Sequence, residues 1–380
     1  MSKNKICPIC ISDYTFPNFI IKKNICNYCI IYNEINKLFP ISQKNKKEAL
    51  IIKKRNKNSK YDVIVGISGG RDSTYLMYYA KKILKLRVLA IHFNDGFSNP
   101  VAGENMSRVT KTLKVDFKIY TSDWKLSKDI KISFLKACVP DIETGTDIGI
   151  ASALYAACYN YNVKDILIGQ SFRTEGISPL LWNFLDGKYV ETIQKKFGNV
   201  DFPDFNPSKI CFNLTPIKIA YYALIKGIKV HHPFYYIKYN KPEISKFIIK
   251  KLKWKPLGAH YYDDLYQPLM FDWYKRKFNI DRRKFNYSAL IRDKQLSRND
   301  ALKKIKKNYI KNNEELLNLS LKRLGISRVF YEKLINNKIK NTFMNFKTSY
   351  DILRKIKFLI KFLCRINIIP PITYYKYFKL

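Results

Sequence analysis

Apolar and polar positions follow a regular pattern from residue 61 onward, and the pattern predicts strands that alternate with helices. Residues 62–67 are dominated by β-branched apolar side chains, which predicts a buried strand. Apolar residues then recur at helical spacing, at Leu76, Tyr79, Ala80, Ile83 and Leu84. Further strands are predicted over 87–93, 116–120 and 165–171, and helices around 106–113 and within 124–161. Elements in this order predict an α/β domain with a doubly wound parallel sheet over residues 61–215.

The rest of the chain divides by composition. Residues 1–40 carry a cluster of cysteines, and the Lys- and Asn-rich residues 41–60 are expected to be a charged connection. Residues 216–345 are predicted to form a mainly helical C-terminal region, followed by a basic amphipathic tail over 346–380.

The tail has one apolar and one basic helical face. The apolar face carries Ile352, Ile356, Leu359, Leu363 and Ile366, and the basic face Arg354, Lys357, Lys361 and Arg365. Such a helix most often docks on its own domain or on a partner, which is the interpretation we favour. The alternative is a peripheral contact with the anionic inner leaflet of a membrane.

Length, hydropathy and charge limit the class of protein to which the chain can belong. The chain has 380 residues, 47% of them hydrophobic, which is enough for a large core. It has no apolar run of membrane-span length, and its start, MSKNKICPIC, lacks the apolar core of a signal peptide, so we expect a cytoplasmic protein. The net charge of +40 suits a polyanionic partner. Because the Lys-, Asn-, Ile- and Tyr-rich composition is also typical of AT-rich codon usage, charge alone predicts no specific nucleic-acid partner.

Four of the eight cysteines have metal-site spacing. Cys7 and Cys10 form one C-x-x-C pair, Cys26 and Cys29 form another, and fifteen residues separate the two pairs. This spacing predicts a zinc site, with an iron–sulfur cluster or free thiols as alternatives. Four thiolates leave no open coordination position, so the zinc is expected to be structural. The single cysteines are expected to be small buried side chains; they are Cys138, Cys158, Cys211 and Cys364.

The stretch ISGGRDS lies where the first predicted strand ends and the first predicted helix begins. At this point a parallel sheet presents backbone N–H groups and a helix N-terminus to an anion. Gly69 and Gly70 allow the backbone to approach phosphate oxygens, and the two serines add hydroxyl donors. Asp72 would repel a phosphate unless a divalent cation bridged them, so the stretch implies magnesium.

Two other phosphate motifs are absent from this stretch, the Gly-Lys of the P-loop and the Gly-x-Gly-x-x-Gly of dinucleotide sites. Ser-Gly-Gly-x-Asp-Ser after a strand instead resembles the PP-loop of the ATP pyrophosphatase superfamily, whose fold is of the adenine nucleotide alpha hydrolase type. The resemblance implies that ATP is cleaved between its α and β phosphates, that a substrate oxygen is adenylated, and that a nucleophile displaces AMP. The candidate ATP-binding residues are Ser68, Gly69, Gly70, Arg71, Asp72 and Ser73.

Longer segments resemble one family, the N-acetyl sugar amidotransferases of bacterial surface-polysaccharide (lipopolysaccharide, O-antigen) biosynthesis. They are KACVPDIETGTDIGIASALYAACYN, ILIGQSFRTEGISPLLWN and residues 254–302, with Lys-Phe-x-Ile-Asp-Arg-Arg and Leu-Ile-Arg-x-x-x-Leu-Ser-Arg elements. The cysteine knuckle is also similar, so the resemblance runs from Cys7 to about residue 340. Ser171 stands where an Asn is expected, and Gly258-Ala259-His260 where Gly-Lys-His is expected. These departures bear on substrate specificity.

The resemblance implies a reaction. The acetamido oxygen of an N-acetylated, nucleotide-linked sugar attacks the α-phosphate of ATP, pyrophosphate leaves, and ammonia displaces AMP to give an acetamidino sugar. No covalent enzyme nucleophile is needed. A separate glutaminase of the histidine-biosynthesis type, with a cyclase-like subunit, would supply the ammonia. The alternative interpretation is a PP-loop enzyme that modifies tRNA, by thiolation or in the manner of lysidine formation.

Residues after the last predicted strand complete the candidate site. Where strand order reverses beside the first strand, the end of 165–171 lies across a crevice from the PP-loop. We therefore expect sugar or adenylate contacts from Gly169, Gln170, Glu175 and Gly176. The catalytic candidates are Asp72, Glu143, Asp147 and Glu175. Asp147 could complete a magnesium site or merely cap a helix, and Glu175 could be an ordinary surface carboxylate.

Overall fold

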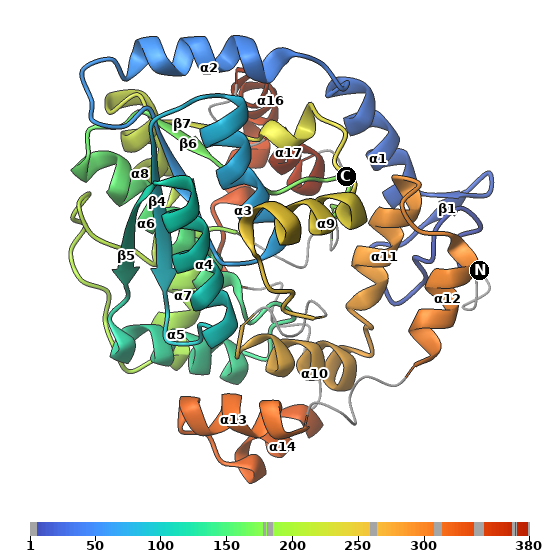
Figure 1. The fold of residues 1–380 in the computed structure, drawn as a ribbon. Coiled ribbons are helices and arrows are strands. Elements are labelled where there is room, and N and C mark those ends of the chain that lie inside the picture. Colours follow the sequence, from blue (N-terminus) through green and yellow to red (C-terminus); the bar gives the residue numbers. More distant parts are fainter. Residues whose placement is uncertain are drawn as a thin grey trace.

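A five-stranded parallel sheet organises the computed structural model (Figure 1). The structure describes residues 6–177, 180, 185–258, 264–307, 314–337, 346–366, 369 and 371–378. Strand order is β5-β4-β3-β6-β7, with bounds β3 (Val63–Gly66), β4 (Val88–Asn94), β5 (Asp116–Thr121), β6 (Asp165–Leu167) and β7 (Lys229–His231). The chain proceeds from β3 to one edge and then returns to β3's other side. Strand order therefore reverses between β3 and β6.

Helices cover both faces of this sheet, which confirms the predicted doubly wound α/β fold. Alternate residues of β3 point to opposite sides, so Val63 and Val65 share one core cluster and Ile64 the other. The first cluster includes residues of α2 (Lys44–Arg55), α3 (Arg71–Tyr78), α4 (Pro100–Leu113) and α9 (Lys241–Leu252). The second includes residues of α5 (Trp124–Lys136), α6 (Thr144–Asn160) and α7 (Gly187–Phe197). Burial on both faces explains the nearly continuous apolar character of β3 and β4.

Two elements lie where the sequence did not predict them. The stretch 41–60 contains helix α2, whose Ala49 and Ile52 pack into the core beneath a lysine-rich outer face. The fifth strand, β7, lies beyond residue 215, in the stretch expected to be helical. Its three residues are too few to show a strand periodicity, and it forms because β6 offers a free parallel edge.

Small elements complete the sheet domain and the knuckle. They are β1 (Ile21–Lys22), β2 (Ile25–Cys26), α1 (Asn27–Leu38), η1 (Tyr79–Ile83), α8 (Pro216–Ala220), η2 (Tyr221–Ile225) and η3 (Pro233–Tyr235). The described C-terminal helices are α10 (Gln267–Phe278), α11 (Arg283–Arg292), α12 (Arg298–Lys306), α13 (Glu314–Leu324), α14 (Arg328–Asn336), α15 (Tyr350–Lys355), α16 (Lys357–Arg365) and α17 (Pro371–Tyr377). None of the helices in the described residues is long and apolar enough to cross a membrane.

The tail is not one continuous helix. It breaks at Ile356 between α15 and α16, which changes the phase of the apolar stripe. Ile360 and Cys364 consequently face inward, and α16 packs against α17. Ile352, Ile356, Leu359 and Ile366, four of the five residues expected on the docking face, are exposed.

Candidate active site

The PP-loop joins β3 to α3 and is shaped by Gly69. This glycine has φ +75°, and a Cβ on it would lie 2.2 Å from the backbone oxygen of Ala102. Only glycine fits both the left-handed conformation and this close approach. Gly70 then caps α3, and the hydroxyls of Ser68 and Ser73 lie 3.2 Å apart. The predicted phosphate-binding residues are thus brought together at a helix N-terminus.

Side chains distant in sequence hold this loop. The indole Nε1 of Trp254 donates to the Gly69 carbonyl at 2.8 Å, and the amide of Asn105 donates to the same oxygen at 3.2 Å. The Asn105 amide also donates to the Lys255 carbonyl at 2.8 Å and so ties the loop to the chain after α9. No role was predicted for Asn105. Trp254 begins the family-like segment, but its function there could not be read from a lone aromatic residue.

Asp72 is surrounded by positive charge and a tyrosine. Its Oδ1 accepts from Arg71 Nε at 2.9 Å and from the hydroxyl of Tyr239. Burial alone would raise the pKa of Asp72, but the charges of Lys241 and Arg71 and the Tyr239 hydrogen bond outweigh it and lower the pKa. Asp72 is therefore a carboxylate at neutral pH, as a magnesium ligand must be.

Gly169 lies directly across from the loop, as the strand reversal predicts. A Cβ on Gly169 would lie 3.2 Å from the backbone oxygen of Asp72. Gln170 follows and is exposed. The chain then turns, with Glu175 N–H donating to the Ser171 carbonyl at 2.9 Å. Gly176, at φ +82°, packs against Ala289 of α11, so the four predicted substrate contacts are spread between the PP-loop and α11.

A second group of ionisable residues surrounds the start of α6. Glu143 accepts from Arg282 at 3.1 Å, and Arg282 also donates to Gln267 at 2.7 Å. Burial and the negative charges of Glu143 and Asp141 raise the pKa of Asp147 well above its usual range. Burial and the charges of Glu143 and Asp95 raise the pKa of Asp264 to about 7. With a pKa of about 7, Asp264 can hold or release a proton near neutral pH, as general acids and bases do.

The alternative that Asp147 caps a helix is wrong. The cap position of α6 is Glu143, and Asp147 lies within the first turns of the helix. The groups that set the pKa of Asp147 include Glu143, Lys376 and Arg282, and Asp72 is not among them. The candidate catalytic residues thus fall into two groups. One is the PP-loop with Asp72, and the other is an acidic cluster around Asp147.

Contacts at the carboxyl end of β4 connect the two groups. The ring of His92 lies 3.1 Å from the Ile67 carbonyl at the PP-loop and 3.1 Å from the hydroxyl of Ser98. Ser98 in turn forms a β-bridge with Asp264 of the acidic cluster. Both groups therefore lie at the same edge of the sheet. Asp264 was missed because no strand or motif marks it in the sequence.

The four knuckle cysteines are buried, and their sulfurs all lie within 4.8 Å of one another. Four thiolates bound tetrahedrally at about 2.3 Å from one zinc ion lie roughly 3.8 Å apart. The Cys10 and Cys26 sulfurs have this separation, 3.8 Å. A four-iron cluster would hold its thiolates farther apart, since each binds a different iron. The site thus fits a single metal ion. Of the other cysteines, Cys138 is half-buried and the remaining three are buried.

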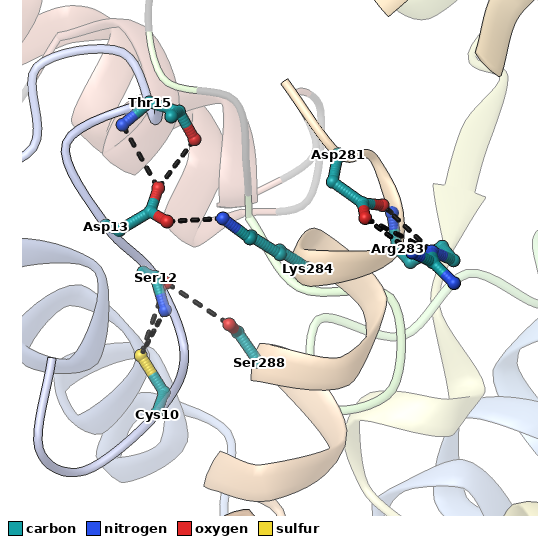
Figure 2. A network of polar contacts seen from close by, with 8 residues as sticks. All are labelled: Cys10, Ser12, Asp13, Thr15, Asp281, Arg283, Lys284 and Ser288. Atoms are coloured by element: carbon teal, nitrogen blue, oxygen red, sulfur yellow. Dashed lines mark hydrogen bonds and ion pairs between the residues drawn. The ribbon is translucent and has the colours of Figure 1, made fainter. Parts of the chain in front are cut away.

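Side chains of α11 and α12, in the C-terminal region, form hydrogen bonds and an ion pair with the knuckle. Arg292 donates to the sulfurs of Cys10 and Cys29, at 3.4 Å each, and Arg298 donates to the Cys10 carbonyl at 3.2 Å. The Ser12 hydroxyl donates to the Ser288 hydroxyl of α11 at 3.3 Å, and Lys284 of α11 pairs with Asp13. Figure 2 shows these contacts between α11 and the knuckle loop.

Comparison with known proteins agrees with this arrangement. Residues 43–134 match the NAD synthase family, and residues 259–358 match the family described as "LPS biosynthesis protein WbpG-like, C-terminal domain". The chain thus joins a PP-loop domain to a WbpG-like C-terminal domain. The predicted resemblance to PP-loop amidotransferases of surface-polysaccharide biosynthesis is confirmed. The region that matches the WbpG-like domain contacts the acidic cluster through Arg282. It contacts the cysteine knuckle through Arg292 and Arg298.

Solved structures give weaker likenesses. An NH3-dependent NAD synthetase from Campylobacter jejuni is 20% identical, with TM-score 0.28, over 40% of this chain and 72% of that chain. A tRNA thiolase from Methanococcus maripaludis, solved with its 4Fe–4S cluster, is 13% identical, with TM-score 0.33, over 78% of this chain and 90% of that chain. No curated protein sequence matches this chain.

Proposed function

We propose that the chain is an ATP-dependent amidotransferase that converts the acetamido group of a nucleotide-linked N-acetyl sugar into an acetamidino group. The coarser statement, an ATP-utilising, amidotransferase-like enzyme of lipopolysaccharide biosynthesis, rests on the two family matches. The observation that carries the finer proposal is the placement of an ionised Asp72 in a PP-loop opposite Gly169, with proton-holding carboxyl groups at the same sheet edge.

In the proposed reaction the PP-loop binds the phosphates of ATP through its N–H groups, Ser68 and Ser73. Magnesium, held by Asp72, would neutralise charge on the departing pyrophosphate. The acetamido oxygen attacks the α-phosphate, which forms an O–P bond and releases pyrophosphate. The oxygen thereby becomes part of a good leaving group, AMP.

Ammonia then attacks the adenylated carbon. After the attack the nitrogen carries three protons and a positive charge, and one of these protons must be lost before AMP departs. We assign its removal to the cluster of Glu143, Asp147 and Asp264, because the raised pKa values of Asp147 and Asp264 suit transient protonation. Gln170, Glu175 and Gly176 are proposed to contact the sugar or adenylate. AMP leaves, and the acetamidinium product remains.

The proposal includes a metal and a partner. The four cysteines would hold a structural zinc ion, since their sulfurs fit one tetrahedral ion. Ammonia would come from a separate glutaminase with a cyclase-like subunit, and the enzyme would act in the cytoplasm.

Free ammonia should replace the glutaminase. Purified protein is incubated with ATP, magnesium, an ammonium salt at alkaline pH and a panel of nucleotide-linked N-acetyl sugars, and products are analysed by mass spectrometry. We expect one sugar to become lighter by the difference between oxygen and NH, with equal amounts of AMP and pyrophosphate and no ADP. Glutamine without a glutaminase should give no product.

The tRNA-modifying alternative is tested in parallel. Copurifying RNA is extracted, and its binding is measured against salt concentration, because phosphate contacts weaken steeply as salt rises. If no sugar changes mass while bound RNA gains a modification, the amidotransferase proposal fails.

A further inference from the structure

The turn between α11 and α12 contacts both the cysteine cluster and the residues beside Asp72. At its start, Arg292 donates to two knuckle sulfurs and, at 3.0 Å, to Ser12 Oγ. Three residues later, Gln295 forms hydrogen bonds with residues 239–241 at the start of α9. The metal site and the PP-loop are therefore joined by one short segment.

Gln295 holds the start of α9 at two points. Its side-chain carbonyl accepts from the Lys241 N–H at 2.9 Å, and its amide donates to the Tyr239 carbonyl at 2.7 Å. The same amide donates to Asp293 at 2.6 Å, and Asp293 accepts from Tyr32 of α1 at 3.0 Å. These partners fix the amide orientation, because a flipped amide would place its NH2 against an N–H group.

The segment that Gln295 holds carries two of the three groups that act on Asp72, and the third is Arg71. The Tyr239 hydroxyl donates to Asp72 Oδ1, and Lys241 contributes a nearby positive charge. The Tyr239 ring is fixed by stacking on Phe234, with ring centroids 4.6 Å apart. The backbone position of residues 239–241 therefore contributes, with Arg71, to the placement of the Asp72 carboxylate.

We propose that Gln295 is a positioning residue that couples the occupied cysteine site to the magnesium–ATP geometry of the PP-loop. The coupling runs from the knuckle sulfurs through Arg292 and Gln295 to Tyr239 and Asp72. It rests on the proposed function only in assuming that the PP-loop binds magnesium and ATP. By linkage, a coupling of this kind is reciprocal, so magnesium–ATP should also retain the metal.

The test measures magnesium–ATP binding by calorimetry, with no sugar present. Gln295→Ala should weaken binding roughly tenfold, since its two hydrogen bonds to residues 239–241 are lost, and should leave the metal content unchanged. ATP binding without magnesium should change little, which a merely structural defect would not reproduce. Tyr239→Phe should cause a similar loss, and the double variant should lose no more than the larger single loss. The control is Ser297→Ala, which removes the α12 cap and leaves Gln295 intact.

Other results would overturn the coupling. Wild-type affinity in Gln295→Ala, equal losses with and without magnesium, or additive losses in the double variant each contradict it. Removal of the metal by a chelator should weaken magnesium–ATP binding in the wild type and much less in Gln295→Ala. Equal effects in both proteins also contradict it. If no sugar is amidated but the binding results are as expected, the proposed substrate is wrong and the coupling still holds.

A separate observation concerns the surface of the tail. Phe358 is 80% exposed and Phe362 55% exposed, one helical turn apart on α16, while Ile360 and Cys364 occupy the docked side. The segment 351–366 carries five basic residues, Arg354, Lys355, Lys357, Lys361 and Arg365, against the single acid Asp351. Exposed aromatic residues among basic ones match the chemistry of an anionic bilayer surface.

We infer that α16 binds the surface of an anionic membrane. Flotation with vesicles of phosphatidylglycerol and phosphatidylethanolamine should recover the protein, and vesicles of phosphatidylcholine alone should not. Phe358→Ser with Phe362→Ser should lower recovery roughly tenfold. The control pair is Leu224→Ser with Ile225→Ser, which are 66% and 71% exposed on η2 and should bind as the wild type does. Equal recovery of all three proteins, or a loss of self-association in the phenylalanine variant without a loss of flotation, would overturn the inference.

Discussion

Asp72→Asn should lower the rate of AMP formation by about a hundredfold to a thousandfold, the range seen when one preorganised electrostatic contact is removed from a transition state. The structure keeps Asp72 ionised through Lys241, Arg71 and Tyr239. An asparagine keeps the shape of the side chain and removes the charge that magnesium requires. The loss should appear in turnover and in the magnesium concentration needed for half-maximal rate. It is measured by coupled detection of pyrophosphate over a magnesium series.

ATP binding without magnesium separates this effect from a general loss of the loop. Arg71 and Lys241 keep their positive charges near position 72 in the variant, so magnesium-free ATP should bind at least as tightly as it does to the wild type. The matched control is Asp116→Asn on β5, whose exposed pair with Lys60 should contribute little. Turnover within tenfold of the wild type in Asp72→Asn would exclude Asp72 as the magnesium ligand.

The sequence could predict the parts of the site that are contiguous. The PP-loop residues lie within six consecutive positions, and the placement of Gly169 follows from strand order alone. The knuckle was predictable because its cysteine spacing encodes the geometry of the ion. In each case the relative positions of the site residues follow from a motif or from the order of the strands.

The missed residues act across long separations. Tyr239 contacts Asp72 from 167 residues away and is one of 28 tyrosines in the chain. Nothing in its local sequence distinguishes it from tyrosines that only pack. Arg292 and Arg298 lie in an element recognised by its resemblance, yet their contact with the cysteines depends on how α11 docks. That docking is a product of tertiary packing, which periodicity does not encode.

Loss of the knuckle metal should have the largest effect on stability. Cys10→Ser removes one ligand, and we expect stoichiometric zinc in the wild type and little in the variant. Metal binding free energy is folding free energy in such sites, so the knuckle should become much less stable. Arg292 would then lie against neutral thiols without its anionic partners. An uncompensated buried charge costs about 3–5 kcal/mol, which should lower the melting temperature by several degrees.

The effect should extend beyond the knuckle, because α11 and α12 hold it through Arg292, Arg298 and Lys284. Hydrogen exchange should therefore speed up in α11 as well as in residues 6–29, while β3 and β4 stay protected. Cys138→Ser is the matched control, since it removes a half-buried thiol that is not part of the cysteine cluster and should keep the metal. If Cys10→Ser retains the melting temperature of the wild type, the cysteine cluster does not stabilise the fold. Faster exchange confined to residues 6–29 would show that the C-terminal helices hold their place without it.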